Sequence, residues 1–149
     1  AERLAATYRN EKEKRENPII IHRAILGSIE RFIAVLIEHT GGNFPVWLAP
    51  VQAIILPVSE KFNDFACEVY TKLKAGDVRV DVDMSKETLN KKIRAAELQK
   101  IPYIIVVGEK EKESGKLAVR CRGEQKIKTM AVADLTKEIN RGKIKIHGR

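Results

Sequence analysis

The sequence predicts an α/β fold in which helices flank a small mixed sheet of about five strands, with a hairpin and a helix ahead of it. Two continuous apolar runs, at residues 51–58 and 103–107, are typical of strands buried on both faces. Two further stretches, at 78–83 and 116–122, alternate apolar and polar residues, as strands with one wet face do. Helical patterns lie between these strands, so we expect parallel pairs joined by right-handed crossovers.

The N-terminal part of the chain predicts a hairpin followed by a helix. Residues 4–8 and 18–21 have an extended pattern, and the charged segment 9–17 between them is either part of a hairpin or a loose excursion. Residues 27–38 predict a helix that is apolar around most of its circumference. Such a helix is expected to be buried inside a larger body.

Glycines and prolines mark the end of this helix and a stiff connector after it. These residues are Gly41, Gly42, Pro45 and Pro50. We therefore place a domain boundary after residue 43, which divides the chain into 1–43 and 44–149.

The first half of the sheet alternates strand, helix and strand. After the apolar run at 51–58, Ser59 opens a helix to about Leu73 whose apolar residues keep the helical period. The strand at 78–83 is expected near a sheet edge, because one of its faces is polar. The next helix is predicted to begin with Ser85 as its N-cap.

This second helix has an apolar face and a polar row beside it. The core positions are Leu89, Ile93 and Ala96, and the polar row consists of Asn90, Arg94 and Glu97. Three lysines, Lys86, Lys91 and Lys92, add positive charge around the helix start. Free backbone N–H groups at a helix start already favour a phosphate, so this end of the helix is a candidate RNA contact.

The strand at 116–122 carries a basic ladder on one face. Leu117, Val119 and Cys121 point one way, and Lys116, Ala118, Arg120 and Arg122 point the other way. The last helix is predicted at 131–140, with Val132, Leu135 and Ile139 facing inward.

Positive charge is concentrated at the C-terminal end. The 149 residues carry a net charge of +8, and residues 116–149 alone hold 10 basic and 3 acidic side chains. A focused basic region is expected of a protein that binds a polyanion, because each neutralised phosphate releases counterions. A merely solvated basic surface is the alternative.

Cysteine usage and hydropathy favour an intracellular protein. Cys67 and Cys121 form no close pair and are each predicted to be small buried apolar residues, which suits a reducing cytoplasm. No apolar run approaches the length of a membrane span, and no signal peptide opens the chain. Because the sequence lacks an initiating Met, we expect it to be a piece of a longer protein.

Two groups of motifs resemble one enzyme family. Residues 22–32 are very similar to the third signature motif of class II aminoacyl-tRNA synthetases, in the form found in threonyl-tRNA synthetases. Residues 44–142 resemble the anticodon-binding domain shared by the threonyl, prolyl, glycyl and histidyl synthetases. The most specific matches lie at 47–52, 89–94, 107–111 and 114–120. The resemblance implies that 1–43 is the end of a catalytic domain and that 44–149 is an anticodon-binding domain.

For the catalytic remnant the resemblance implies one ATP contact and one zinc ligand. Arg31 matches the arginine that binds ATP phosphate, and His22 matches one of three ligands of a zinc that selects threonine. The whole enzyme would then be a cytoplasmic, homodimeric threonine–tRNA ligase that uses ATP with Mg²⁺ and zinc in protein biosynthesis. No membrane or DNA partner is expected. The fragment alone is expected to be inactive and without cofactor, because motifs 1 and 2 and two zinc ligands are missing.

For the anticodon-binding domain the resemblance implies a set of RNA-contacting residues. Arg94, Glu111 and Arg120 match positions that contact anticodon bases, and Arg122 and Lys86 are included in the predicted set. Well-known bacterial members have asparagine where this chain has Lys86, so a phosphate contact is the alternative there. Arginine can grip a phosphate or a guanine edge with two parallel bonds, and splayed anticodon bases present such edges.

Structural roles are the alternatives for three of the candidate residues of the two domains. Glu111 is otherwise a helix-start carboxylate, Arg120 a surface partner of Glu124 or Asp81, and Arg31 a side chain at a helix edge with its head in water. For the whole chain, the alternative function is a protein-interaction or regulatory module on the same fold. The retention of both His22 and Arg31 argues against that alternative.

Overall fold

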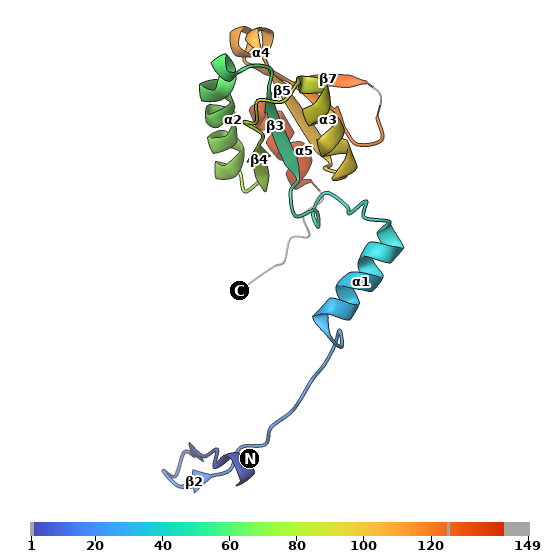
Figure 1. Ribbon diagram of the computed structural model, residues 1–149. Helices are drawn as coiled ribbons and strands as arrows, with labels where there is room; N and C mark the ends of the chain where they lie inside the picture. The colour runs from blue at the N-terminus through green and yellow to red at the C-terminus, as the bar shows by residue number, and fades with distance from the viewer. Residues whose placement is uncertain (1, 125, 142–149) are drawn as a thin grey trace. The chain divides into compact units, whose positions relative to one another are not determined.

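The computed structural model describes residues 2–124 and 126–141 (Figure 1). Contacts divide the chain into two compact units, Ala1–Glu38 and His39–Arg149, which we describe separately. In the described residues, no helix has both the length and the apolar character needed to cross a membrane.

The first unit contains a very small hairpin. After η1 (Glu2–Leu4), β1 (Tyr8–Arg9) pairs antiparallel with β2 (Arg15–Glu16). Of the two alternatives expected here, the hairpin is present, but its strands lie at the two ends of the charged segment. The prediction of extended arms at 4–8 and 18–21 was wrong apart from Tyr8. Local polar bonds explain this. The Asn10 side chain accepts from the backbone N–H groups of Lys12 and Lys14, at 2.9 and 3.0 Å, and holds the turn closed.

The predicted apolar helix exists, but it is not buried. Helix α1 (Ile29–Thr40) begins after Ser28, whose Oγ accepts the Arg31 N–H at 3.2 Å, and it ends at Thr40, directly before Gly41, which has a positive φ of 57°. No residue of α1 is buried, so the expectation of burial is wrong for this chain. The physical reason is that a helix needs a second packed layer to cover it. The rest of the first unit, which consists of a 3-10 turn, a hairpin with two residues in each strand and coil, offers none.

The second unit is built on the predicted mixed sheet, which has five strands in the order β4-β3-β5-β6-β7. The strands are β3 (Ala53–Pro57), β4 (Val80–Val82), β5 (Tyr103–Val107), β6 (Lys116–Cys121) and β7 (Ile127–Ala131). Strand β3 pairs parallel with β4 and β5, whereas the β5–β6 and β6–β7 pairs are antiparallel. The fold class and the edge position of β4 are confirmed. Strand β7 was not located by its sequence pattern.

Helices cover both faces of this sheet. Short η2 (Glu60–Phe62) leads into α2 (Asn63–Ala75), which packs with α5 (Val132–Asn140) on one face around Ile55, Ile105 and Val119. Helix α3 (Leu89–Leu98) packs on the other face against Leu56 and Ile104. Figure 1 shows α3 in front of the sheet and α5 behind it. A short helix that the pattern did not reveal, α4 (Glu109–Ser114), follows β5.

The start of α3 differs from its prediction. The helix begins at Leu89 with Thr88 as N-cap, so the assignment of Ser85 as N-cap was wrong. The Ser85 N–H instead donates to Asp83 Oδ1 at 2.9 Å, because an aspartate side chain offers the backbone a turn in place of a helix. Lys92, expected to add exposed charge, is buried, and its Nζ donates to the Asp83 carbonyl at 3.0 Å.

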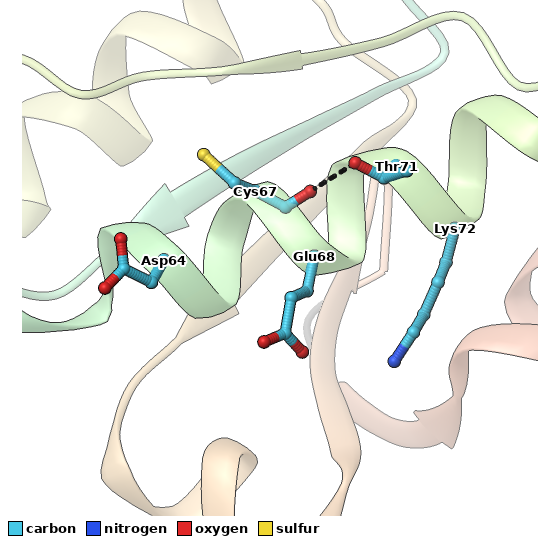
Figure 2. Close-up of a pocket in the computed structure, with 5 residues that line it drawn as sticks. All are labelled: Asp64, Cys67, Glu68, Thr71 and Lys72. Carbon is cyan, nitrogen blue, oxygen red and sulfur yellow. Dashed lines mark hydrogen bonds between the residues drawn. The ribbon is translucent and has the colours of Figure 1, made fainter.

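The burial prediction for the cysteines was wrong for Cys67. This side chain is exposed on α2, while Cys121 is half-buried on β6. Figure 2 shows Cys67 on the outer surface of α2, where its carbonyl oxygen accepts the Thr71 hydroxyl at 2.8 Å. The inward face of this helix is filled by Ala66, Val69 and Leu73, which leaves the next position, Cys67, facing solvent.

Candidate nucleic-acid interface

The expected RNA-contacting residues come from the α3 side of the sheet and from the segments that follow the carboxyl ends of β4 and β5. Arg120 on β6 pairs with Ile104 near the start of β5. Leu117 and Val119 on the same strand belong to the buried cluster on the other face of the sheet, which α2 and α5 cover. Lys86 follows β4 and Glu111 follows β5, so both lie at the carboxyl ends of the parallel strands. Arg94 is in the middle of α3. We call these four residues, Lys86, Arg94, Glu111 and Arg120, the strip. Arg120 and Lys86 border different pockets, so the residues of the strip do not share one cavity.

Arg120 borders a pocket of about 180 Å³ with an apolar floor. Ile101 and Ile104 contribute to this floor, and Glu97 and Glu124 stand at its border. The Arg120 Nε is buried, and no acceptor for it occurs among the described residues. The alternative of an ion pair with Glu124 or Asp81 is not observed in that part of the chain, and Glu124 pairs with Lys128 at 2.9 Å instead. A buried N–H without a partner is costly, so a turn of the Arg120 side chain toward an acceptor in the pocket would be favourable.

Arg122, in the turn directly after β6, is engaged by the protein itself. Its Nη1 donates to the Lys100 carbonyl and its Nη2 to the Phe44 carbonyl, both at 2.6 Å. These bonds tie the connector before β3 to the end of α3. Arg122 also borders the Arg120 pocket, so it supports that pocket from behind.

Sequence reasoning missed two residues that hold the same connector. Arg79 donates from Nε to the Ala49 carbonyl and from Nη2 to the Trp47 carbonyl, at 3.0 and 2.7 Å. Gln52 is completely buried, and its amide donates to the Val46 carbonyl and accepts from the Arg79 N–H. A glutamine at the head of an apolar strand was the signal for such a buried polar contact.

Glu111 has the structural role that was considered as its alternative. Its Oε2 accepts the Gly108 N–H at 3.0 Å, which closes a capping box at the start of α4. The side chain is half-buried, so the carboxylate is held in a fixed place on the rim of the strip.

Lys86 and Arg94 are both exposed. Lys86 lies 3.4 Å from Glu60 in an ion pair whose side chains are 88% and 68% exposed, respectively. Exposed pairs of this kind contribute little to stability, about 0–1 kcal/mol. Arg94 has no ion-pair partner in the described parts of the chain. Both cations are therefore available to a ligand.

Strands β5, β6 and β7 carry a second group of titratable residues, which includes Tyr103, Cys121 and Lys128. Burial, followed by the charge of Glu138, raises the pKa of Tyr103 to about 12. Burial also raises the pKa of the Cys121 thiol. The Lys128 ammonium, bonded to Glu124, has its pKa raised above the usual value. These groups belong to a structural network at the edge of α5, and the raised thiol pKa disfavours a nucleophilic Cys121.

The two residues expected to serve catalysis both lie in the first unit. His22 is exposed in a segment without regular structure, and Arg31 is exposed in the first turn of α1. Within residues 2–124 and 126–141, no three His, Cys, Asp or Glu side chains gather to hold a metal ion. A zinc site needs three or four ligands, so the described residues do not make one.

A shallow hollow on α2 offers no second site. It is lined by Asp64, Cys67, Glu68, Thr71 and Lys72, which all come from one helix face (Figure 2). The side chains in Figure 2 extend outward rather than toward a common point. The α3 side of the sheet therefore remains the candidate interface.

Comparisons with known proteins identify the family of this domain. The family model described as "Anticodon binding domain" matches residues 52–141. The chain is 48% identical over 132 residues to a threonine–tRNA ligase of Cytophaga hutchinsonii, and this match covers 89% of the chain and 20% of that protein. It is 47% identical over 139 residues to the threonine–tRNA ligase of Bacteroides fragilis, covering 93% of the chain and 22% of the relative. The chain thus spans about a fifth of the length of these relatives.

Solved structures give the same picture. The RNA binding domain of threonyl-tRNA synthetase from Cryptosporidium parvum Iowa II has a TM-score of 0.73 and 40% sequence identity, over 93% of this chain and 35% of that one. Histidyl-tRNA synthetase from Nostoc sp. PCC 7120 has a TM-score of 0.60 at 20% identity, covering 75% of this chain and 27% of that one. At that identity the second likeness shows the fold alone.

Proposed function

The chain belongs to the anticodon-binding domain family, and from this premise we propose that it recognises the anticodon loop of a threonine-accepting tRNA. In this proposal it is the C-terminal part of a threonine–tRNA ligase, with residues 1–43 as the end of the catalytic domain and 44–149 as the anticodon-binding domain. The observation that carries the proposal is the unpaired Arg120 Nε beside a pocket with an apolar floor.

The proposed chemistry of recognition follows from the donors on the strip. Arg120 turns to donate from its guanidinium to a base edge, which also gives its unpaired Nε an acceptor, and the apolar residues of its pocket contact the face of the base. Arg94 and Lys86 supply further positive charge, and Glu111 accepts from a base N–H. Arg122, whose terminal nitrogens already bind carbonyls, contributes by fixing the pocket wall.

The proposed parent enzyme activates threonine with ATP and Mg²⁺ and then transfers it to tRNA. In that enzyme Arg31 neutralises ATP phosphate charge, and His22 is one of three zinc ligands. Because the described residues supply only that one ligand, we derive no step through zinc. For the parent enzyme we also propose two further zinc ligands outside this chain, homodimer contacts through the catalytic domain and a cytoplasmic location. We expect elemental analysis of the purified chain to find no stoichiometric zinc and threonine-dependent ATP–pyrophosphate exchange to be absent.

A titration with short RNAs tests the recognition proposal. The chain should bind a stem-loop with a threonine anticodon more tightly than one with an unrelated anticodon. The logarithm of the binding constant should fall with the logarithm of salt concentration, with a slope of about −0.7 for each single-strand phosphate contacted. Equal affinity for both loops at every salt concentration would leave only generic charge binding and contradict the proposal.

The exposed apolar residues of α1 favour a second candidate, a protein-interaction module. Phe32 and Ile33 are among the large apolar side chains of this helix that face solvent. Such a face requires a protein partner, which is either the proposed catalytic domain or another protein. Loss of α1 should leave stem-loop binding unchanged if the chain is an RNA-recognition module. A chain that binds no anticodon loop but associates through α1 would support the second candidate.

A further inference from the structure

A second pocket lies at the carboxyl ends of β3 and β4. Its volume is about 230 Å³, and it is bordered by the loops that follow the two strands and by α3. Ser59 and Asn63 come from the first loop and from α2, Ser85 and Lys86 come from the second loop, and Lys92 comes from α3. All five side chains can donate a hydrogen bond.

The chain path makes this crevice. From β3 the chain continues into α2 on one face of the sheet, and from β4 it continues into α3 on the other face. Two neighbouring parallel strands whose connections leave to opposite faces form a topological switch point, which is where open α/β sheets bind ligands. We call this the switch-point pocket.

Lys92 gives the switch-point pocket a buried cation. The residue is only 5% exposed, although it carries a charge. Its Nζ donates to the Asp83 carbonyl at 3.0 Å, and that is the one acceptor for this ammonium among the residues the structure describes. An ammonium has three N–H donors, so two remain for a ligand. A buried cation with unused donors favours an anionic ligand.

The carboxylates at the pocket border are already paired with lysines. Glu60 pairs with Lys86 at 3.4 Å, and Glu87 pairs with Lys91 at 2.7 Å. The first pair is highly exposed, so its lysine can exchange Glu60 for another anion at little cost. An incoming anion therefore meets one buried cation and one cation that is free to turn toward it.

We infer that the switch-point pocket binds a phosphate group, held by the ammonium groups of Lys86 and Lys92 and by the hydroxyls of Ser59 and Ser85. As a source we assign a phosphodiester of the bound RNA backbone, a choice that rests on the proposed function. A free phosphate compound offers the same chemistry, and the experiment separates the two. Lys86 in this assignment holds the backbone and does not recognise a base.

Matched lysine variants test the RNA source. Lys86→Gln and Lys91→Gln each remove one positive charge from an exposed ion pair, but only Lys86 lines the pocket. Lys86→Gln should weaken anticodon stem-loop binding about tenfold and make the salt slope shallower by about 0.7, as expected for one lost single-strand contact. Lys91→Gln should have a clearly smaller effect on both.

An uncharged backbone then locates the contact. A series of stem-loops is made, each with a methylphosphonate in place of one phosphate. At one position of the series, the replacement should weaken binding to the unmodified protein but not to Lys86→Gln. Lys92→Met, which keeps the buried stem and removes the ammonium, should lose the sensitivity to the same position. Its thermal unfolding is measured in parallel, so that a loss of folding is recognised as such.

Inorganic phosphate tests the pocket without RNA. In an NMR titration of the unmodified chain, phosphate should shift the amide resonances of Ser59, Ser85 and Lys86, and Lys86→Gln should reduce these shifts. Shifts without any RNA position coupled to Lys86 would assign the pocket to a free phosphate compound. The absence of both the phosphate shifts and the coupled RNA position would overturn the inference, even if specific stem-loop binding upheld the proposed function. Failure of all stem-loop binding would instead contradict the proposed function, and the phosphate titration would still decide whether the pocket binds phosphate.

Discussion

Arg120 and Arg122 have different environments although they lie only two residues apart, Arg120 on β6 and Arg122 in the turn that follows it. The Nε of Arg120 is buried without a partner, whereas both terminal nitrogens of Arg122 bind backbone carbonyls at 2.6 Å. The guanidinium of Arg120 is therefore not held by an acceptor at Nε, whereas that of Arg122 is fixed by two bonds to the protein. Their sequence context is the same basic ladder, so only their tertiary neighbours separate the two roles.

Replacing Arg120 should alter anticodon recognition specifically. Arg120→Ala, and separately Arg94→Ala, should each cost about 1–3 kcal/mol of stem-loop binding and relax discrimination among anticodon bases. Lys137→Ala, an exposed change on α5 at the opposite face, is the control and should affect all RNAs alike. Binding is measured with a panel of stem-loops that differ at one anticodon base. If Lys137→Ala changed base preference more than the two arginine variants do, the interface would not lie on the α3 side of the sheet.

Tyr103 should make stability fall at high pH. Its pKa is raised from 10.0 to about 12 in the folded chain, chiefly by burial and then by Glu138, so the folded state holds the proton more tightly than the unfolded state. This contribution is complete below pH 10 and is lost as the pH rises through about 12. Chemical denaturation across that range should show the loss, and Tyr103→Phe should remove that part of it. A Phe variant with the same pH dependence as the unmodified chain would contradict the assignment.

At the scale of elements, helices α2 and α5 meet at a glycine. A Cβ added at Gly76 would lie 2.4 Å from Thr136 Cγ2, which is far inside the van der Waals distance. The Asn140 side chain also donates to the Gly76 carbonyl at 2.9 Å. The end of α2 can approach α5 this closely only because the residue has no side chain.

A pair of variants tests this contact. Gly76→Ala should lower the free energy of unfolding by about 1–3 kcal/mol through overpacking. Thr136→Ser removes the clashing methyl and keeps the hydroxyl that donates to the Val132 carbonyl, so it should restore most of the loss. Denaturant unfolding of the four proteins of this double-mutant cycle measures the coupling. Simple addition of the two single effects would show that Thr136 is not the residue that excludes a Cβ.

At the scale of the whole molecule, the chain consists of two units of unequal cohesion. The second unit contains the five-stranded sheet and both buried clusters, whereas the helix α1 has no buried residue. Stability should therefore reside almost entirely in the second unit.

Truncation tests this division. A chain of residues 39–149 should have the same free energy of unfolding as the full chain, to within about 0.5 kcal/mol, the range typical of surface changes. It should also self-associate less at high concentration, because the exposed apolar face of α1 is removed. Sedimentation measures the association. A marked loss of stability on truncation would mean that residues 1–38 contribute to the core of the second unit.

The sequence alone determined the class of this fold and most of its elements. Strands β3 and β5 follow from their continuous apolar runs, and α5 follows from its inward Leu135 and Ile139. Periodic burial is recorded directly in the order of side chains, which is why it can be predicted without coordinates. The resemblance of residues 44–142 to anticodon-binding domains could likewise be stated from motifs alone.

Only the tertiary structure decided which polar side chains are free and which are committed. It buried Lys92 and Gln52, paired Arg122 with the connector, and left the Arg120 Nε without an acceptor. It also left α1 exposed, and it formed a hairpin with only two residues in each strand where the pattern suggested longer strands. The physical reason is that hydrogen-bond partners and covering layers come from residues distant in sequence, so their presence depends on how the chain folds back on itself.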